Sequence, residues 1–216
     1  MDFSALITRT KLWLNFNDDQ ADLDYTEAQI KAGLNMAYSE EVSKAKAEGS
    51  QRWFSAVTEH TWSSGEVTYT VPAPLNRIAV RRIMDVTNDA EPGSQVLFSE
   101  TGAQGEVFWK DRNTLQWGST GPGQDTTLRF IYVASPEELV NDIDVPELVP
   151  DEFHELLPLS AAILLRGMAD ESPPPWWVSK QDDYRLDYWK FVSRGRPLDD
   201  IPSVGGFEGE FENGVF

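Results

Sequence analysis

The residues whose types could support catalysis are few, and their spacing fits no common catalytic pattern. Only two histidines, His60 and His154, occur in the 216 residues, and cysteine is absent. Neighbouring carboxylates such as Asp182–Asp183 and Asp199–Asp200 could serve as an acid and a base in proton transfer. Among 36 acidic residues such pairs arise by chance, so we interpret them as solvated side chains.

Sequence patterns for binding phosphate or metal ions are also missing. Residues 102–105 and 118–123 are glycine-containing turns, but neither leads from a strand into a helix, as phosphate binding requires. Without cysteine, neither a disulfide nor a thiolate metal site can form. No nucleophile elbow is present either. We therefore expect no enzymatic activity, no cofactor and no metal ion.

The two histidines receive structural interpretations. His60 is expected in a strand, and His154 in a helix close to its start. Because Glu152 and Glu155 flank His154, we expect its imidazole on the surface or at a subunit contact. A role in sensing pH is the alternative, since histidine titrates near neutral pH.

Acidity dominates the composition, with 36 acidic against 18 basic residues, a formal net charge of -18 and a pI near 4.4. Binding to nucleic acid depends on Lys and Arg displacing condensed counterions, so sequence-specific DNA binding is not expected. The acidity has two interpretations: it keeps the protein in solution, or it repels DNA that passes nearby. Composition alone leaves both open.

Tryptophan is abundant, with eight residues in the chain. Trp62, Trp109 and Trp117 fall in an expected β-region, where an exposed aromatic platform could bind sugar rings. The competing interpretation places these residues in a core or an interface, as is usual for tryptophans on strands. A carbohydrate- or partner-binding module is therefore the alternative function.

Four helices are predicted, two near each end of the chain. They cover residues 3–14, about 26–48, about 150–168 and 179–192, and apolar residues recur in them at helical spacing. Such stripes must be buried, so one helical bundle is expected. The expected first-turn and capping residues are Asp2 or Ser4, then Thr26 with Gln29, then Pro150, then Ser179 with Asp182.

Details within these helices are less regular. Glu41 interrupts the apolar stripe of the second helix, and Met168 is placed at the end of the third stripe. The run Ser172–Trp177, SPPPWW, is expected to be a stiff polyproline spacer whose two tryptophans cover the end of the bundle. The residues expected to face inward from the fourth helix are Tyr184, Asp187 or Tyr188, and Phe191.

The middle of the chain alternates short apolar or β-branched segments with turn residues. This pattern predicts a small antiparallel sandwich or barrel. Residues 111–113 are expected to form its tightest hairpin. The predicted strands are Val67–Val71, Ile78–Val86, Val96–Phe98, Val107–Trp109, Thr114–Trp117 and Leu128–Val133.

Residues 134–150 lead from this β-region back to the helices. Pro136 should stop strand pairing, and Pro146 and Pro150 should keep the segment extended because the proline ring fixes φ. The expected fold class is therefore α+β. A helical bundle is formed by residues 1–52 and 134–195, and a β-domain is inserted at residues 53–133.

An acidic, glycine-rich arm is expected over residues 196–216. From Leu198 to Phe216 it holds five carboxylates and no lysine or arginine. One interpretation is a disordered tail. The other is strand addition to a partner, because aromatic and acidic residues alternate along the arm. The residues of this hypothetical docking arm are Phe207, Glu208, Glu210, Phe211, Glu212 and Phe216.

Targeting and membrane signals are not apparent. The start of the chain lacks a basic region followed by an apolar one, and the nearly apolar run Leu156–Leu165 is too short to cross a bilayer. We expect no membrane partner and no export.

The order of these features resembles the head-to-tail adaptor, or neck, proteins of tailed bacteriophages. The resemblance covers residues 3–170. It includes the first helix, the segment Ala32–Tyr38 on a Thr-capped helix, and the aromatic entry at Trp53. It continues with Tyr69–Pro72 in the β-region and with the return passage from Ile131 to Ala162. Nothing beyond residue 170 contributes to it.

This resemblance implies a structural virion protein of the neck, made in the host cytoplasm. Family members form rings, commonly of twelve subunits, between the portal and a downstream tail or nozzle protein. The genome passes through the channel without specific binding, and an acidic wall would keep DNA from adhering. The carboxylates available for such a wall are Glu27, Glu40, Glu41, Glu48 and those between Asp142 and Glu155.

Overall fold

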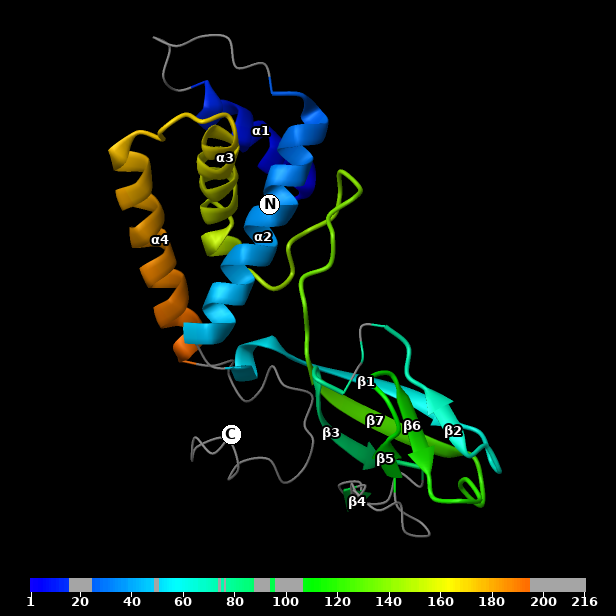
Figure 1. Ribbon diagram of the computed structural model, residues 1–216. Helices are drawn as coiled ribbons and strands as arrows, with labels where there is room; N and C mark the ends of the chain where they lie inside the picture. The colour runs from blue at the N-terminus through cyan, green and yellow to red at the C-terminus, as the bar shows by residue number, and fades with distance from the viewer. Residues whose placement is uncertain are drawn as a thin grey trace. The chain divides into compact units, whose positions relative to one another are not determined.

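The computed structural model describes residues 1–15, 25–48, 51–73, 75, 77–87, 94, 95 and 107–194. These residues form four α-helices and two small antiparallel sheets, which confirms the α+β class (Figure 1). They divide into two compact units. The helical unit contains Met1–Ser50 and Ser135–Gly195, and the β unit contains Gln51–Ala134.

The first two helices begin at the caps that the sequence predicts. In α1, Phe3–Leu14, the Asp2 carboxylate accepts a hydrogen bond of 2.8 Å from the backbone N–H of Ala5. In α2, Glu27–Glu48, Thr26 and Gln29 form the predicted capping box. The Gln29 amide oxygen accepts from the Thr26 N–H at 2.8 Å, and the Thr26 hydroxyl accepts from the Gln29 N–H at 3.3 Å.

The third helix starts later than predicted. A 3-10 turn, η3, occupies Asp151–Phe153, and α3 covers Leu156–Met168. Met168 is 61% exposed, so its predicted place in the buried stripe is wrong. α3 instead buries residues on most of its circumference, including Leu159, Ala162 and Leu165. It packs against the other three helices and occupies the centre of the helical unit.

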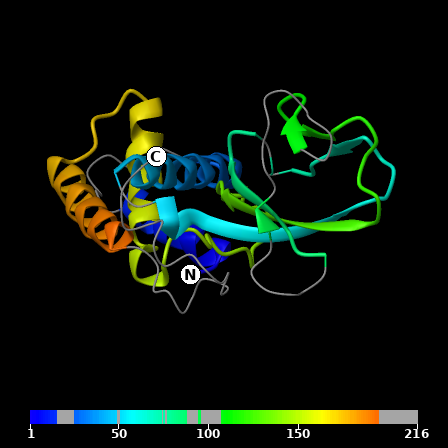
Figure 2. The same cartoon turned by 90° about the horizontal axis from the view of Figure 1, so that it is seen from below.

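The fourth helix starts earlier than predicted, because proline is well tolerated in a first helical turn. α4 covers Pro175–Ser193 and lies beside α3 in both ribbon views (Figures 1 and 2). The polyproline spacer is thus reduced to Pro173 and Pro174. Ser179 is no cap, since its hydroxyl donates to the Pro175 carbonyl at 3.3 Å. Tyr188, not Asp187, faces inward and is fully buried.

The β unit contains a short 3-10 helix, η2 (Gln51–Phe54), and two sheets. One sheet has the strand order β1-β7-β3-β4 and the other β2-β6-β5. β5 and β6 begin and end as predicted. The strand bounds are β1 Ser55–Trp62, β2 Thr68–Thr70, β3 Val80–Asp85, β4 Ser94–Gln95, β5 Val107–Trp109, β6 Thr114–Trp117 and β7 Thr126–Val133.

The predicted strands and the observed strands differ at β1. The six predicted strands omit β1, although its residue His60 is expected in a strand; β1 pairs along its whole length with β7. The predicted strand Val96–Phe98 lies outside the described residues. The hairpin at residues 111–113 joins β5 to β6, and the Asp111 carboxylate accepts from the Asn113 N–H at 2.9 Å. This hydrogen bond lowers the pKa of Asp111.

Both sheets contribute to one apolar cluster. Its largest member, Trp62, is fully buried, and Ile83, Leu115 and Phe130 pack in the same cluster. The turn that contains Gly121 depends on this residue being glycine. Gly121 has a φ of +72°, and a Cβ at this position would stand 2.4 Å from the Glu66 carbonyl oxygen. No larger residue fits there without moving backbone.

Candidate functional site

Residues 135–150, which we call the strap, are fixed to the helical unit by specific hydrogen bonds. The Asn35 side chain on α2 bonds both backbone groups of Leu139, donating to its carbonyl at 3.0 Å and accepting from its N–H at 2.8 Å. The Tyr38 hydroxyl accepts from the Leu148 N–H at 3.2 Å, and the Tyr188 hydroxyl donates to the Leu148 carbonyl at 3.1 Å. The strap thus joins α2 to α4.

The strap also receives the start of α1. The N–H groups of Phe3 and Ser4 donate to the carbonyls of Asp144 and Asp142, at 2.8 and 3.0 Å. These bonds satisfy donors that a helix leaves unpaired in its first turn. The Asp144 carboxylate accepts from the N–H groups of Val140 and Asn141, both at 2.7 Å, and these bonds lower its pKa. The predicted extended conformation is therefore wrong here, because this part of the strap is a turn.

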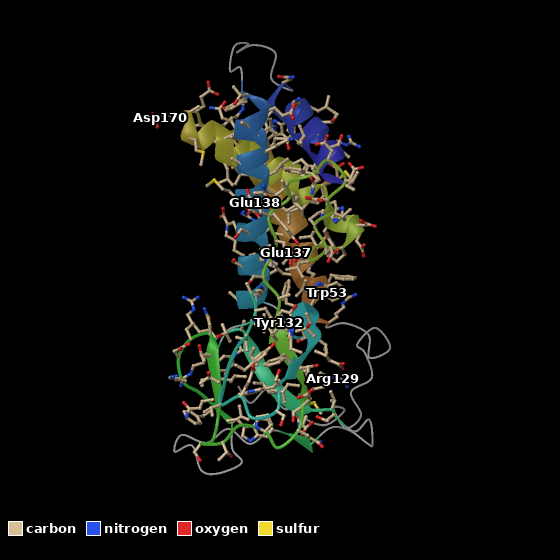
Figure 3. All side chains as sticks on the ribbon, turned by 90° about the vertical axis from the view of Figure 1, so that its right-hand side faces the viewer. Trp53, Arg129, Tyr132, Glu137, Glu138 and Asp170 are labelled. Carbon is tan, nitrogen blue, oxygen red and sulfur yellow. The ribbon has the colours of Figure 1, made fainter. Side chains whose placement is uncertain are left out.

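Three large aliphatic side chains of the strap are exposed. Val140, Ile143 and Val145 are 63%, 81% and 43% exposed. Asp142 and Asp144 stand between them in the sequence, and Glu137 and Glu138 precede them near the strap's start (Figure 3). The strap is thus anchored by hydrogen bonds, and its exposed surface carries both aliphatic and acidic side chains.

Negative charge is concentrated in the helical unit. Its sequence contains 22 acidic and 10 basic residues, whereas the β unit contains 9 acidic and 7 basic residues. Of the carboxylates considered for an acidic wall, Glu27 is 58% and Asp142 is 73% exposed. Glu40 is 41% exposed and pairs with Lys44. The side chain of Glu48 lies outside the described residues.

Glu41 does not belong among the candidates for an acidic wall, because it is fully buried. Arg185 on α4 donates from Nε to both of its carboxylate oxygens, at 3.0 and 2.9 Å. Ser160 on α3 donates to Oε1 at 2.8 Å, and Gln181 donates to the Ser160 hydroxyl at 2.8 Å. Glu41 therefore links three helices instead of facing a channel. Its interruption of an apolar stripe was the sequence signal, but the partners lie more than 100 residues away.

The prediction that His154 lies on the surface is wrong, because its side chain is fully buried. Its Nε2 lies 2.7 Å from the Val149 carbonyl oxygen and therefore carries the ring proton. Nδ1 is then an acceptor and contacts the amino group of Met1, with the Asp151 carboxylate 3.2 Å away. Burial lowers the pKa of His154 below its usual value of 6.5.

This burial predicts a pH dependence of stability. The unfolded chain takes up a proton on His154 as pH falls through about 6.5, whereas the folded chain resists it, so the free energy of unfolding falls below that pH. One proton corresponds to at most about 1.4 kcal/mol per pH unit. We expect denaturant titrations between pH 7.5 and 5.5 to show a shallower pH slope in His154→Gln than in the unsubstituted chain. A slope in His154→Gln equal to that of the unsubstituted chain would contradict the assignment.

The tryptophans of the β unit do not form an exposed platform. Trp62 is fully buried and donates from Nε1 to the Glu66 carbonyl at 2.8 Å. Trp117 lies edge-on to it with ring centroids 5.5 Å apart, and Trp109 is also half-buried against the apolar cluster. The arrangement gives the carbohydrate-binding alternative no support. In the helical unit, Trp177 is buried between α1 and α3, whereas Trp176 is 44% exposed.

The predicted docking arm, with Phe207, Glu208, Glu210, Phe211, Glu212 and Phe216, lies outside the described residues. Within the described ranges, no group of three His, Cys, Asp or Glu side chains could hold a metal ion. None of the described helices is long and apolar enough to span a bilayer.

The described residues thus form an acidic α+β chain whose strap exposes aliphatic and acidic side chains. The model of the SU10 adaptor protein family matches residues 1–194, and the chain belongs to this family of bacteriophage head–tail adaptors. The match confirms the resemblance predicted for residues 3–170 and extends it through α4. It implies a structural component of the virion that assembles with other virion proteins. No curated protein matches the chain significantly.

Proposed function

We propose that copies of this chain form a ring, of twelve subunits, between the portal and the tail of a bacteriophage. The genome would pass through the ring's channel without specific binding. The observation that carries the proposal is the excess of acidic residues in the helical unit of a head–tail adaptor. A wall with the same charge as DNA repels the duplex over about one Debye length, roughly 8–10 Å at physiological salt.

The finer architecture belongs to the same proposal. The four helices and the strap would form a bundle around the channel, and the two sheets would form a sandwich or barrel lobe inserted into it. The proposed lobe is supported by the apolar cluster, to which both sheets contribute residues. The proposed bundle is supported by the packing of α3 against the other three helices. The exposed carboxylates Glu27, Glu40 and Asp142 remain candidates for the wall.

The oligomeric state tests this proposal. Sedimentation of the purified chain, alone and mixed with the portal protein of the same virion, should show a species of ring mass in at least one of the two samples. A chain that sediments as a monomer in both samples would contradict the proposal.

The partners are proposed from the same family membership. They are the portal on one side and a tail or nozzle protein on the other, in a neck assembled from subunits made in the host cytoplasm. The arm with Phe207, Glu208, Glu210, Phe211, Glu212 and Phe216 would dock on the portal or on a neighbouring subunit. Deleting residues 203–216 should weaken co-sedimentation with portal or with other copies; unchanged association in both assays would remove the arm from the proposal.

A further inference from the structure

A small basic surface lies at the turn between β5 and β6, although the chain as a whole has a formal net charge of -18. Lys110 and Arg112 belong to this turn, and Arg77 is attached beside it, because its N–H donates to the Arg112 carbonyl at 2.8 Å. All three side chains are exposed, and none of them forms an ion pair with a described carboxylate. We call Arg77, Ile78, Lys110 and Arg112 the basic patch.

The basic patch combines positive charge with an apolar side chain. Ile78, next to Arg77 in the sequence, is 70% exposed. Asp111 lies between the two cations of the turn and is kept ionised, because the hydrogen bond from the Asn113 N–H lowers its pKa. Three cations and this one carboxylate leave a local charge of +2. Such a surface is complementary to a partner that is both acidic and apolar.

The strap of the helical unit has the opposite charge. Glu137, Glu138 and Glu147 are exposed, and none of them forms an ion pair with a described lysine or arginine. Burial, and after it the charges of Glu147 and Glu137, raises the pKa of Tyr38 to about 12. Both carboxylates therefore lie near the same hydroxyl group, although ten residues separate them in the sequence. The start and the end of the strap thus present negative charge in one region.

The exposed aliphatic side chains of the strap, Val140, Ile143 and Val145, belong to one compact turn. The Asp144 carboxylate accepts from the N–H groups of Val140 and Asn141, and the Asp144 N–H donates to the Asn141 carbonyl at 3.0 Å. Because these bonds already hold the turn, a partner would not have to order it on binding. The strap is therefore a preorganised surface that is both acidic and apolar.

We propose that the basic patch of one copy binds the strap of the next copy. The cations of the patch pair with Glu137, Glu138 and Glu147, and Ile78 packs against the exposed aliphatic side chains of the strap. Opposite charges determine which surfaces meet, and the apolar contact adds buried area. The inference rests on the proposed ring: because the two surfaces differ, repeated contacts run head to tail and can close into a ring.

Duplex DNA is the competing occupant of a basic surface. Its phosphates would pair with the cations, but the phosphate backbone offers no apolar counterpart to Ile78. The net charge of -18 also repels DNA, whereas the strap of a second copy supplies both the carboxylates and the aliphatic side chains. A second copy therefore fits the basic patch better than DNA does.

Charge reversal on the two surfaces tests the contact. The patch variant is Lys110→Glu with Arg112→Glu, and the strap variant is Glu137→Lys with Glu138→Lys. All four side chains are exposed, so both variants should fold. Sedimentation is measured in the sample, with or without portal, in which the unsubstituted chain assembles. Each variant alone should associate at least about tenfold more weakly, because like charges then face each other across the contact.

Mixing the two variants distinguishes a contact between copies from one within a chain. In the mixture, each patch can meet a strap of opposite charge on the other variant, so alternating copies should associate as the unsubstituted chain does. A contact within one chain would not be restored, because each variant keeps two surfaces of the same charge. Failure of the mixture to regain association would overturn the proposal.

A matched control separates the patch from the total charge. Lys190→Glu with Arg194→Glu on α4 makes the same change in net charge and should leave association unchanged. A loss equal to that of the patch variant would assign the effect to net charge and overturn the inference. A patch variant that assembles normally but binds a DNA duplex more weakly would assign the patch to DNA and leave the ring intact. An unsubstituted chain that stays monomeric with and without portal would contradict the proposed ring itself.

Discussion

Replacing Glu41 with alanine should destabilise the helical unit by about 3–5 kcal/mol, the usual cost of removing one partner from a buried ion pair. Glu41 is fully buried, and the Arg185 side chain is only 17% exposed, so the guanidinium would stay largely desolvated without its counter-charge. Ser160 would also lose the acceptor of its hydroxyl proton. Denaturant titration followed by helical circular dichroism measures the loss.

Two matched variants make this expectation specific. Glu40→Ala, one residue earlier, removes only a surface pair with Lys44 and should cost less than about 0.5 kcal/mol. Replacing both Glu41 and Arg185 with leucine should restore much of the lost stability, since apolar pairs often substitute for buried ion pairs without net loss. A Glu41→Ala variant as stable as Glu40→Ala would show that Glu41 is not buried in this network.

The network also explains why a charge sits in the core. We expect an apolar residue at position 41 to allow more than one packing arrangement against α3 and α4. The carboxylate accepts from Arg185 and Ser160 in one arrangement, with Gln181 donating to Ser160. Buried polar groups fix the register of packed helices in some proteins. We expect the leucine double variant to be stable yet to show broader side-chain resonances.

Replacing Gly121 with alanine should destabilise the β unit by about 3 kcal/mol or more. Alanine at a positive φ costs about 1–2 kcal/mol because Cβ crowds the neighbouring carbonyl. At Gly121 the new Cβ would also stand 2.4 Å from the Glu66 carbonyl oxygen and 2.8 Å from the Gly65 carbonyl carbon. These are backbone atoms, so the turn itself would have to move. Denaturant titration followed by tryptophan fluorescence, to which tryptophans of both units contribute, measures the effect.

Two other glycines distinguish the conformational cost of a positive φ from the cost of the close contact with the Glu66 carbonyl. Gly65 has a similar φ of +76° but no atom within 4 Å of an added Cβ, so Gly65→Ala should show the conformational cost alone. Gly123 has open space and no positive φ, and Gly123→Ala should be close to neutral. If Gly121→Ala is no worse than Gly65→Ala, the close approach to Glu66 does not limit this turn.

Local signals predicted the elements whose boundaries depend on nearby residues. The capping pair Thr26 and Gln29 fixes the start of α2, and the turn at residues 111–113 fixes the β5–β6 hairpin. The start of α4 was missed because a proline run fits both an extended spacer and a first helical turn. β1 was missed because four polar residues, Thr58 to Thr61, obscure its alternation.

Residues with distant partners could not be placed from sequence. Glu41 needs Arg185, which is 144 positions away, before its burial makes sense. His154 has acidic neighbours that suggest a surface, yet the Val149 carbonyl and the Met1 amino group enclose its ring. In both cases the polar side chain is buried because partners from other segments satisfy it. For Glu41 the sequence offered only an anomaly, a charged residue that interrupts an apolar stripe, and for His154 it offered no such signal.

Electron microscopy of the 216-residue chain, alone and mixed with the portal protein of the same virion, would show whether the protein forms a ring around a channel. We expect twelve-subunit rings in one or both samples, with the helical units around an open channel and the ring seated below the portal. A chain that remains monomeric in both samples, or a ring whose channel is lined by β units, would contradict it.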